Sequence, residues 1–321
     1  MQNGQKRLYC KYWLKQIKSK THKGLKKINK RIYKRFKKKC IIFVFHKLTY
    51  TMINQKKKVL FVSSEMTPFI NESPVSALAR FLPQAIQEKN YDVRVLIPRF
   101  GVINERRNKL HEVVRLSGIN ISIDEKDNPL TIKVASITEA KMQVYFLDNE
   151  DFYQRKFIFN NDKNVAFDDN DERVIFFCKG VLETVKKLGW SPDIIHCQGW
   201  MTSLIPVYIR TLYKDEPVFR NSKIVYSVFE NETDTTLGAD FVRKATLNAI
   251  DDKHFETFAN GSPKSMQLGA IQNSDAVVDC TSQMNAECIE FAKDKPQMVH
   301  EEGNLGEKYD AFYDKVMTSA K

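Results

Sequence analysis

The sequence has no apolar stretch that reaches the length of a membrane span. The apolar patch Ile41 to Phe45 ends at His46 and Lys47, whereas a transmembrane helix needs roughly twenty predominantly apolar residues. The patch follows 40 residues of chain, which is too far from the start for a secretory signal. We therefore expect no membrane partner.

Paired cysteines are also lacking. The six cysteines form no CxxC pair and show no metal-ligand spacing, so the sequence predicts neither a metal site nor a cofactor bound through sulfur. Cys178 and Cys197 lie in apolar, strand-like surroundings, where a free thiol usually behaves as a small buried hydrophobe. These features favour a reduced, cytoplasmic protein. There are no internal repeats either.

Acidic residues are absent from the start of the chain. Residues 1–51 contain 17 Lys or Arg and no Asp or Glu, while the remaining residues carry 34 basic and 39 acidic side chains, a net charge of −5. This basic segment has several interpretations: a nucleic-acid or anionic-lipid arm, a targeting segment without the expected serines, or a disordered solvated tail. The simplest interpretation is a misassigned start, with translation beginning at Met52. We predict a tail over 1–51 and a folded domain over 52–321, and expect no nucleic acid as partner.

Residues Lys58 to Arg99 are predicted to form the βαβ unit at the centre of the fold. Val59 to Val62 form a continuous apolar run, as in a strand covered on both faces. Ser73 is a good N-cap and Pro74 suits the first helical position; the apolar residues that follow recur at helical spacing. A second strand covers Val93 to Ile97. In such a βαβ unit ligands bind at the carboxyl end of the first strand, which directs attention to residues 63–74.

The rest of the chain alternates strands and helices around a β-rich insertion. Short strands are predicted at 111–116, 119–123, 131–136 and 142–147, and a polar, aromatic excursion at 152–171. Helices then follow at 172–187, 202–212, 265–272, 283–292 and 310–317, with strands at 193–196, 223–228 and 276–279. This pattern predicts an α/β fold with a single Rossmann-like, doubly wound parallel sheet carrying a β-rich insertion.

Several segments, taken in order, resemble the N-terminal catalytic domain of bacterial glycogen and starch synthases. They include KVLFVSSEMTP (58–68), DVRVLIPR (92–99), VYFLDN (144–149), DNDERVIFFCKGVLE (169–183) and PDIIHCQGWMTSLIP (192–206). A further match, IQNSDAVVDCTSQMNAECIE, covers 271–290. The resemblance implies the N-terminal half of a GT-B fold, in which two Rossmann-like domains face a cleft. It also implies ADP-glucose and α-1,4-glucan as partners, since the family transfers glucose from the first to the second.

Three departures from the family pattern bear on activity. Where the family has Lys-x-Gly-Gly after the first strand, this chain has Asn71-Glu72-Ser73-Pro74, which removes a cation and a backbone donor from a loop built to hold a diphosphate. Where the family has His-x-His-Asp-Trp, the chain has His196-Cys197-Gln198-Gly199-Trp200; the family's Thr-Ile-His-Asn appears as 227–230, SVFE. The sequence also stops at Lys321, before the family's C-terminal domain. We therefore expect that the chain alone is not competent for transfer.

No residue is predicted to be catalytic. The candidate substrate-binding residues are Glu65, Asn71, His196, Gln198 and Trp200. For Glu65 and Trp200 a structural role is the stronger interpretation, whereas His196 at a strand end is equally balanced between packing and ligand contact. Gln198, at the family's histidine position, keeps the ability to hydrogen-bond a sugar hydroxyl.

Three functions remain open. The first is a glycosyltransferase completed by another chain, such as a C-terminal-half subunit. The second is a non-catalytic relative that binds glucan or an active synthase and regulates it. The third is an unrelated nucleotide or nucleic-acid binder that uses the basic residues 1–51.

Overall fold

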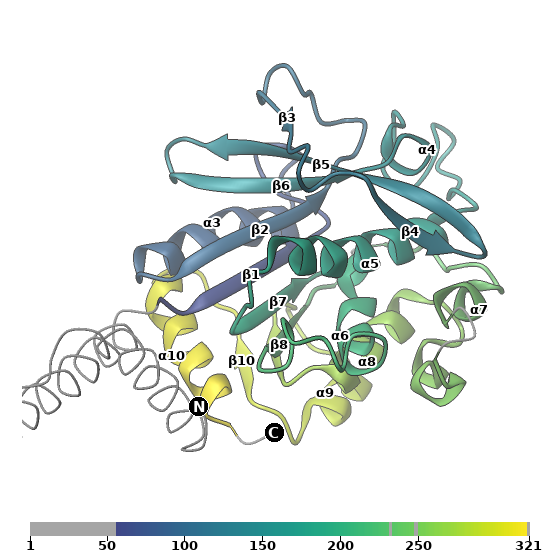
Figure 1. Cartoon of the computed structure of the whole chain (residues 1–321). Helices are drawn as coiled ribbons and strands as arrows, with labels where there is room; N and C mark the ends of the chain where they lie inside the picture. Colours follow the sequence, from purple (N-terminus) through teal and green to yellow (C-terminus); the bar gives the residue numbers. More distant parts are fainter. Residues whose placement is uncertain (1–55, 231–232, 247–249, 320–321) are drawn as a thin grey trace, which may run out of the picture. The chain divides into compact units, whose positions relative to one another are not determined.

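A ten-stranded sheet runs through the part of the chain that the computed structural model describes, residues 56–230, 233–246 and 250–319 (Figure 1). The strand order is β10-β9-β8-β7-β1-β2-β6-β5-β3, with β4 paired to β5. The prediction for residues 1–51 lies outside the described residues.

The strands from β10 to β6 are parallel and form the Rossmann-like part of the sheet. In chain order they are β1 (Lys58–Ser63), β2 (Asp92–Pro98), β6 (Met142–Asp148), β7 (Ile194–Gln198), β8 (Lys223–Val228), β9 (Ala276–Asp279) and β10 (Gln297–Val299). The predicted doubly wound α/β sheet is thus confirmed.

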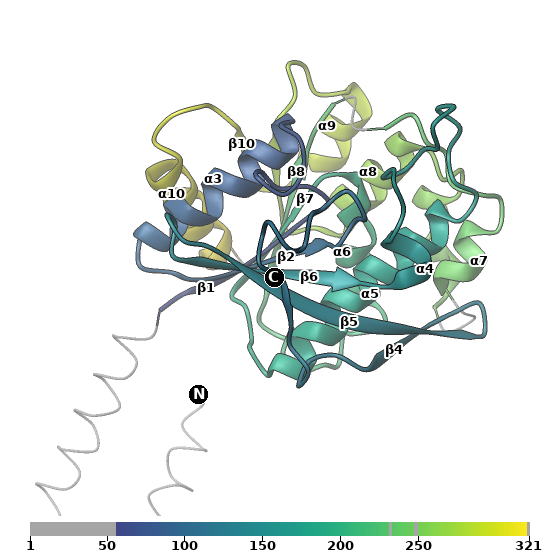
Figure 2. The same ribbon diagram turned by 90° about the horizontal axis from the view of Figure 1, so that it is seen from above.

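Helices cover both faces of this sheet. They are α3 (Pro74–Glu88), α4 (Glu150–Tyr153), α5 (Asn170–Leu188), α6 (Leu204–Arg210), α7 (Phe241–Thr246), α8 (Pro263–Asn273), α9 (Ala286–Ala292) and α10 (Leu305–Thr318). Figure 2 shows α3 and α10 side by side on one face and α5 on the other. Alternate residues of β1 explain this: Val59 and Phe61 join the core beneath α3 and α10, while Leu60 and Val62 join the core beneath α5 and α6.

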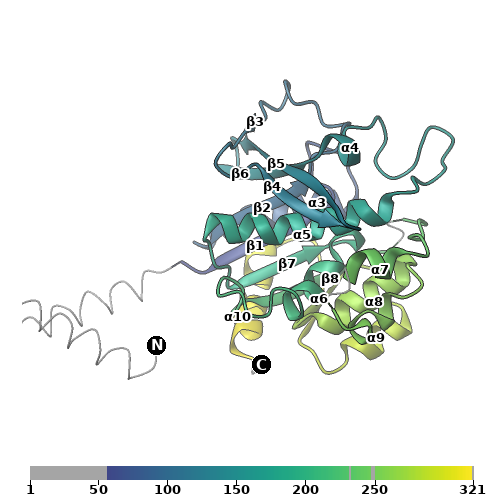
Figure 3. The same cartoon turned by 45° about the vertical axis from the view of Figure 1, so that its right-hand side comes forward.

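The predicted β-rich insertion is present as antiparallel strands β3 (His111–Glu112), β4 (Ile119–Ile123) and β5 (Lys126–Ile137), with β5 on β6. Figure 3 shows the β4–β5 hairpin lying along α5. The hairpin turns on Asp124 and Glu125, both with positive φ, as a two-residue hairpin of the primed type requires. Because β5 pairs with β4 up to this turn, it begins five residues before the predicted 131–136.

Several further elements differ from the prediction. The strand expected at 111–116 ends at Glu112, because the chain turns from Val113 to Leu116. The edge strand β10 and the short helices α4 and α7 were not predicted. Helix α10 begins at Leu305 rather than at residue 310, directly after Asn304, whose side chain makes no cap hydrogen bond. Among the described residues, no helix has the length and apolar content to cross a bilayer.

Candidate functional site

The site follows from the order of the strands around β1. Its chain-order neighbour β2 lies on one side and β7 on the other, so the connections leave β1 and β7 in opposite directions. Ligands of open α/β sheets bind at such a switch point, outside the carboxyl ends of the strands. Ser63 at the end of β1 is in register with Gln198 at the end of β7. Four of the five predicted residues, Glu65, Asn71, Gln198 and Trp200, therefore lie at or beyond this one edge.

The amino terminus of α3, which faces this edge, is closed by its own side chains. Ser73 Oγ accepts a hydrogen bond from Ser76 N (3.0 Å), and Ser76 Oγ accepts one from Ser73 N (2.8 Å), a reciprocal capping box. Pro74 has no N–H to offer. The predicted N-cap and first-turn proline are confirmed, and together they consume backbone donors that would otherwise be available to an anion.

Glu65 is fastened to this cap. Ser73 Oγ donates to Glu65 Oε2 at 2.6 Å, so a carboxylate occupies the position beside the helix terminus where phosphate oxygens bind in other proteins. Asn71 is exposed, and its backbone oxygen accepts from Ser76 Oγ at 3.0 Å. The next residue, Glu72, adds a second acid. The loop is therefore acidic, and several of its polar groups are hydrogen-bonded to one another.

His196 lies inside the core, two residues short of the edge. Its Nδ1 is 2.6 Å from Tyr313 Oη of α10 and its Nε2 is 2.7 Å from Ser227 Oγ of β8. Burial, with a smaller contribution from the charge of His300, lowers the pKa of His196 to about 3. The ring is thus a neutral structural link between the sheet and α10, with both nitrogens engaged.

Gln198 is fully buried and neither its Oε1 nor its Nε2 has a hydrogen-bond partner among the described residues. Its neighbours in register are Ser63 and Ser227, and Ser227 already binds His196. An amide offers two donor hydrogens and an acceptor oxygen, and leaving such a group unsatisfied costs roughly 1–3 kcal/mol. The switch point therefore contains a neutral polar group whose bonding capacity is unused.

Trp200 packs beneath a neighbouring loop. It is 2% exposed and begins a 3₁₀ turn, Trp200–Thr202, after Gly199, whose φ of 84° favours glycine. Its ring contacts the edge of Phe159, with ring centroids 5.0 Å apart. Trp200 thus positions residues 154–169 next to the end of β7.

Three further acidic residues, at the end of β6 and around the start of α5, are paired with cations. Asp148 pairs with Lys133 (2.8 Å), Asp169 with Arg155 (2.8 Å between Oδ1 and Nη1), and Asp171 with Lys244 (2.9 Å). No group of three or more potential metal-ligating side chains occurs in the described parts of the chain. These acids hold loops together instead of forming a binding site.

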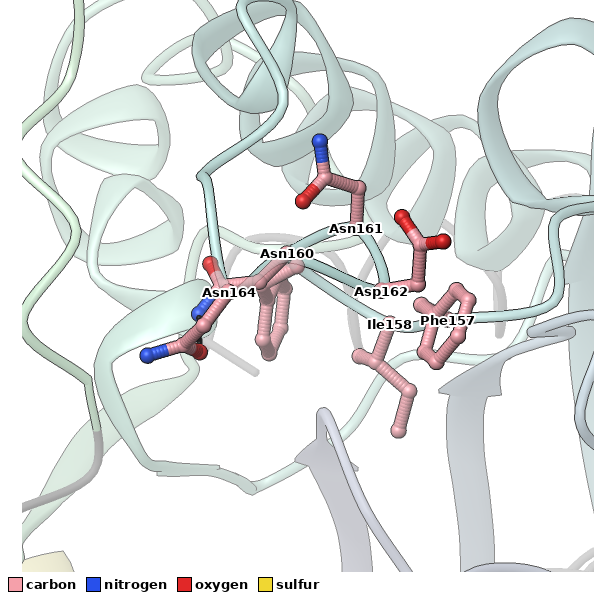
Figure 4. A pocket seen from close by; sticks show the side chains of 7 residues that line it. Phe157, Ile158, Asn160, Asn161, Asp162 and Asn164 are labelled. Atoms are coloured by element: carbon pink, nitrogen blue, oxygen red, sulfur yellow. Dashed lines mark hydrogen bonds between the residues drawn. The ribbon is translucent and has the colours of Figure 1, made fainter.

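Sequence reasoning missed one feature, a hollow in the segment predicted only as a surface excursion. Residues 157–162 and Asn164 line an open depression of about 430 Å³, and Figure 4 shows that its labelled side chains all project from this one loop. The mixed polar and aromatic composition of 157–164 was the available signal. The hollow is linked to the site through the contact between Phe159 and Trp200, and the spacing of these residues in the sequence does not predict that contact.

Comparisons with known proteins agree with this architecture. The family model described as "Starch synthase catalytic domain" matches residues 58–299. A glycogen synthase from Pelodictyon phaeoclathratiforme is 40% identical over 178 residues, covering 55% of this chain and 36% of the relative. One from Chlorobium phaeovibrioides is 34% identical over 244 residues, covering 74% and 48%. The chain thus spans between about a third and a half of the length of these curated relatives.

A solved structure shares the fold. It is the catalytic domain of Starch Synthase IV from Arabidopsis thaliana bound to ADP and acarbose, with a TM-score of 0.63 at 17% sequence identity. The match covers 77% of this chain and 52% of that chain.

Proposed function

Because the chain belongs to the starch synthase catalytic-domain family, we propose that this domain binds α-1,4-glucan at the carboxyl ends of β1 and β7 and does not by itself transfer glucose from ADP-glucose. It would act as a non-catalytic glucan-binding member of a glycosyltransferase family.

The observation that carries this proposal is the closed terminus of α3. A diphosphate needs cations and free backbone N–H groups, but here Pro74 offers no N–H and the N–H of Ser76 is bound by Ser73 Oγ. The Glu65 carboxylate binds the same hydroxyl. A phosphate about 4 Å from that carboxylate would be repelled by roughly 4 kcal/mol at an effective dielectric constant of about 20. A neutral sugar meets no such barrier.

The buried amide of Gln198 supports a neutral, polyhydroxylated ligand. Each sugar hydroxyl both donates and accepts, which matches the unsatisfied Nε2 and Oε1. Binding that makes the buried amide accessible to the sugar would relieve the cost of leaving it unpaired, whereas a phosphate would use only its donor hydrogens. Both features of the edge therefore select the glucan over the nucleotide sugar.

Calorimetric titrations of the full chain test the proposal. We expect saturable binding of glycogen and of maltoheptaose, no binding of ADP-glucose, and no incorporation of labelled glucose into glycogen. Saturable ADP-glucose binding or transfer by the chain alone would contradict the exclusion of the donor. Absence of glucan binding would contradict the assigned ligand.

A further inference from the structure

The hollow lined by residues 157–162 and by Asn164 lies on the loop between α4 and α5, next to the edge described above (Figure 4). We propose that this hollow is a second carbohydrate subsite, which holds a glucose unit of the same α-glucan chain. The inference rests on the proposed function, because it assumes that the domain binds glucan.

The polar lining of the hollow is almost entirely uncharged. It consists of the amides Asn160, Asn161 and Asn164, with Asp162 as the single ionisable side chain and no Lys or Arg. A phosphate or nucleotide site is built from cations, so this lining selects a neutral ligand. Amide groups, which donate and accept, match the hydroxyls of a sugar.

One acceptor in the hollow is unsatisfied. Asn160 Nδ2 donates to Asn164 Oδ1 at 2.9 Å, but Asn160 Oδ1 is buried without a partner among the described residues. Buried polar atoms in native proteins are nearly always paired. A sugar hydroxyl entering the hollow would supply the missing donor.

Phe157 provides the apolar wall. Phe157 is 43% exposed, which leaves part of its ring open to a ligand. The face of an aromatic ring carries partial negative charge and attracts the weakly positive C–H groups of a pyranose. One exposed ring flanked by amides is therefore a suitable surface for one glucose unit.

The loop is held in shape by hydrogen bonds of its own. Asn161 Oδ1 accepts from Lys163 N (2.9 Å) and Val165 N (3.0 Å), and Asn170 Nδ2 donates to Phe159 O (2.8 Å). Beneath the loop, the Arg173 guanidinium is packed against the Phe159 ring. A preorganised site loses little conformational entropy on binding, so more of the contact energy appears as affinity.

The hollow is joined to the switch point through one packing contact. Phe159, a lining residue, rests on Trp200, which follows Gln198 by two residues. A glucan bound at the carboxyl ends of β1 and β7 can therefore continue along this edge toward Phe157. A maltooligosaccharide long enough to meet both should bind more tightly than maltose.

The test uses the full chain titrated with maltoheptaose and compares Phe157→Ala with Phe81→Ala. Phe81 is a matched control, because it is 54% exposed but lies on α3. Removing the ring from the hollow should weaken binding by about tenfold, in line with the loss of part of the burial of one Phe side chain, and the control should leave the affinity unchanged. Hydrogen exchange should slow at residues 157–165 when maltoheptaose is present.

The outcomes separate this inference from the proposed function. Equal affinity of Phe157→Ala and the unsubstituted chain, or no added protection at 157–165, would overturn the second subsite and leave the proposed function intact. Failure of the unsubstituted chain to bind maltoheptaose would overturn both.

Discussion

Replacing Gln198 by leucine should stabilise the protein while weakening its binding of glucan. The side chains are similar in size, so the substitution needs little repacking. In the folded state the amide has lost its water and has found no partner among the described residues, a cost of roughly 1–3 kcal/mol. Leucine carries no such cost and gains from burial in the same position.

We expect the free energy of unfolding to rise by about 1–2 kcal/mol. For a domain of this size each kcal/mol corresponds to roughly 2–4 °C in Tm, so Tm should rise by about 2–8 °C. Thermal and urea denaturation of the two proteins would measure the change. Maltoheptaose titration of the same samples should show a loss of affinity, because the group assigned to the sugar hydroxyls is gone.

Asn170→Leu is the matched control for a satisfied amide. Asn170 is almost as inaccessible as Gln198, but its Nδ2 donates to Phe159 O and its Oδ1 accepts from Arg173 Nη1 at 2.6 Å. Leucine at this position would leave Phe159 O and Arg173 Nη1 without their hydrogen-bond partner, so this variant should lose stability. If Gln198→Leu also lost stability, the amide would be satisfied in solution, for example by an ordered water, and the reasoning would be refuted.

Two more predictions concern the same edge. The unfolded chain binds a proton at His196 below about pH 6.5, whereas the folded pKa is about 3, so stability is fully present above pH 6.5 and is lost as pH falls toward 3. Urea unfolding should give a free energy roughly 2–3 kcal/mol lower at about pH 4.5 than at about pH 7 from this group, and an equal drop in His196→Gln would contradict it. A variant combining Glu65→Gln, Asn71→Lys, Ser73→Gly and Pro74→Gly should gain calorimetrically detectable ADP-glucose binding, because it removes the carboxylate beside the helix terminus, adds a cation and restores backbone donors. No gain would mean that the α3 terminus does not decide nucleotide binding.

The sequence was sufficient where local rules decide the structure. Ser73 and Pro74 marked the start of α3, and the apolar run Val59 to Val62 marked a strand covered on both faces. The sheet order follows from alternating strands and helices. All of these signals lie within a few residues of the element that they define.

The elements that were missed depend on distant contacts or on unusual backbone. Helix α10 starts after Asn304 without a side-chain cap and is held by packing of Tyr309 and Tyr313 against the sheet, so no start signal marks it. The turn at Asp124 and Glu125 has positive φ at residues that seldom adopt it. At the site, the predicted strands were enough to place Glu65 and Gln198 at one edge of the sheet. Their roles could be assigned only from the hydrogen bonds that each makes or lacks in the folded chain.

Glu65 and Gln198 have opposite effects on the stability of the fold, but both favour a neutral ligand at this edge. Glu65 stabilises the cap of α3 through Ser73 and in the same position repels an anion, so a contact that favours folding also restricts the ligand. Gln198 does the reverse, because its unpaired amide destabilises the fold and only a neutral hydrogen-bonding ligand compensates it. A ligand that binds the folded state alone raises stability in proportion to the logarithm of its concentration. Saturating glucan should therefore raise Tm in the unsubstituted chain by more than in Gln198→Leu, since only the former has the amide to satisfy.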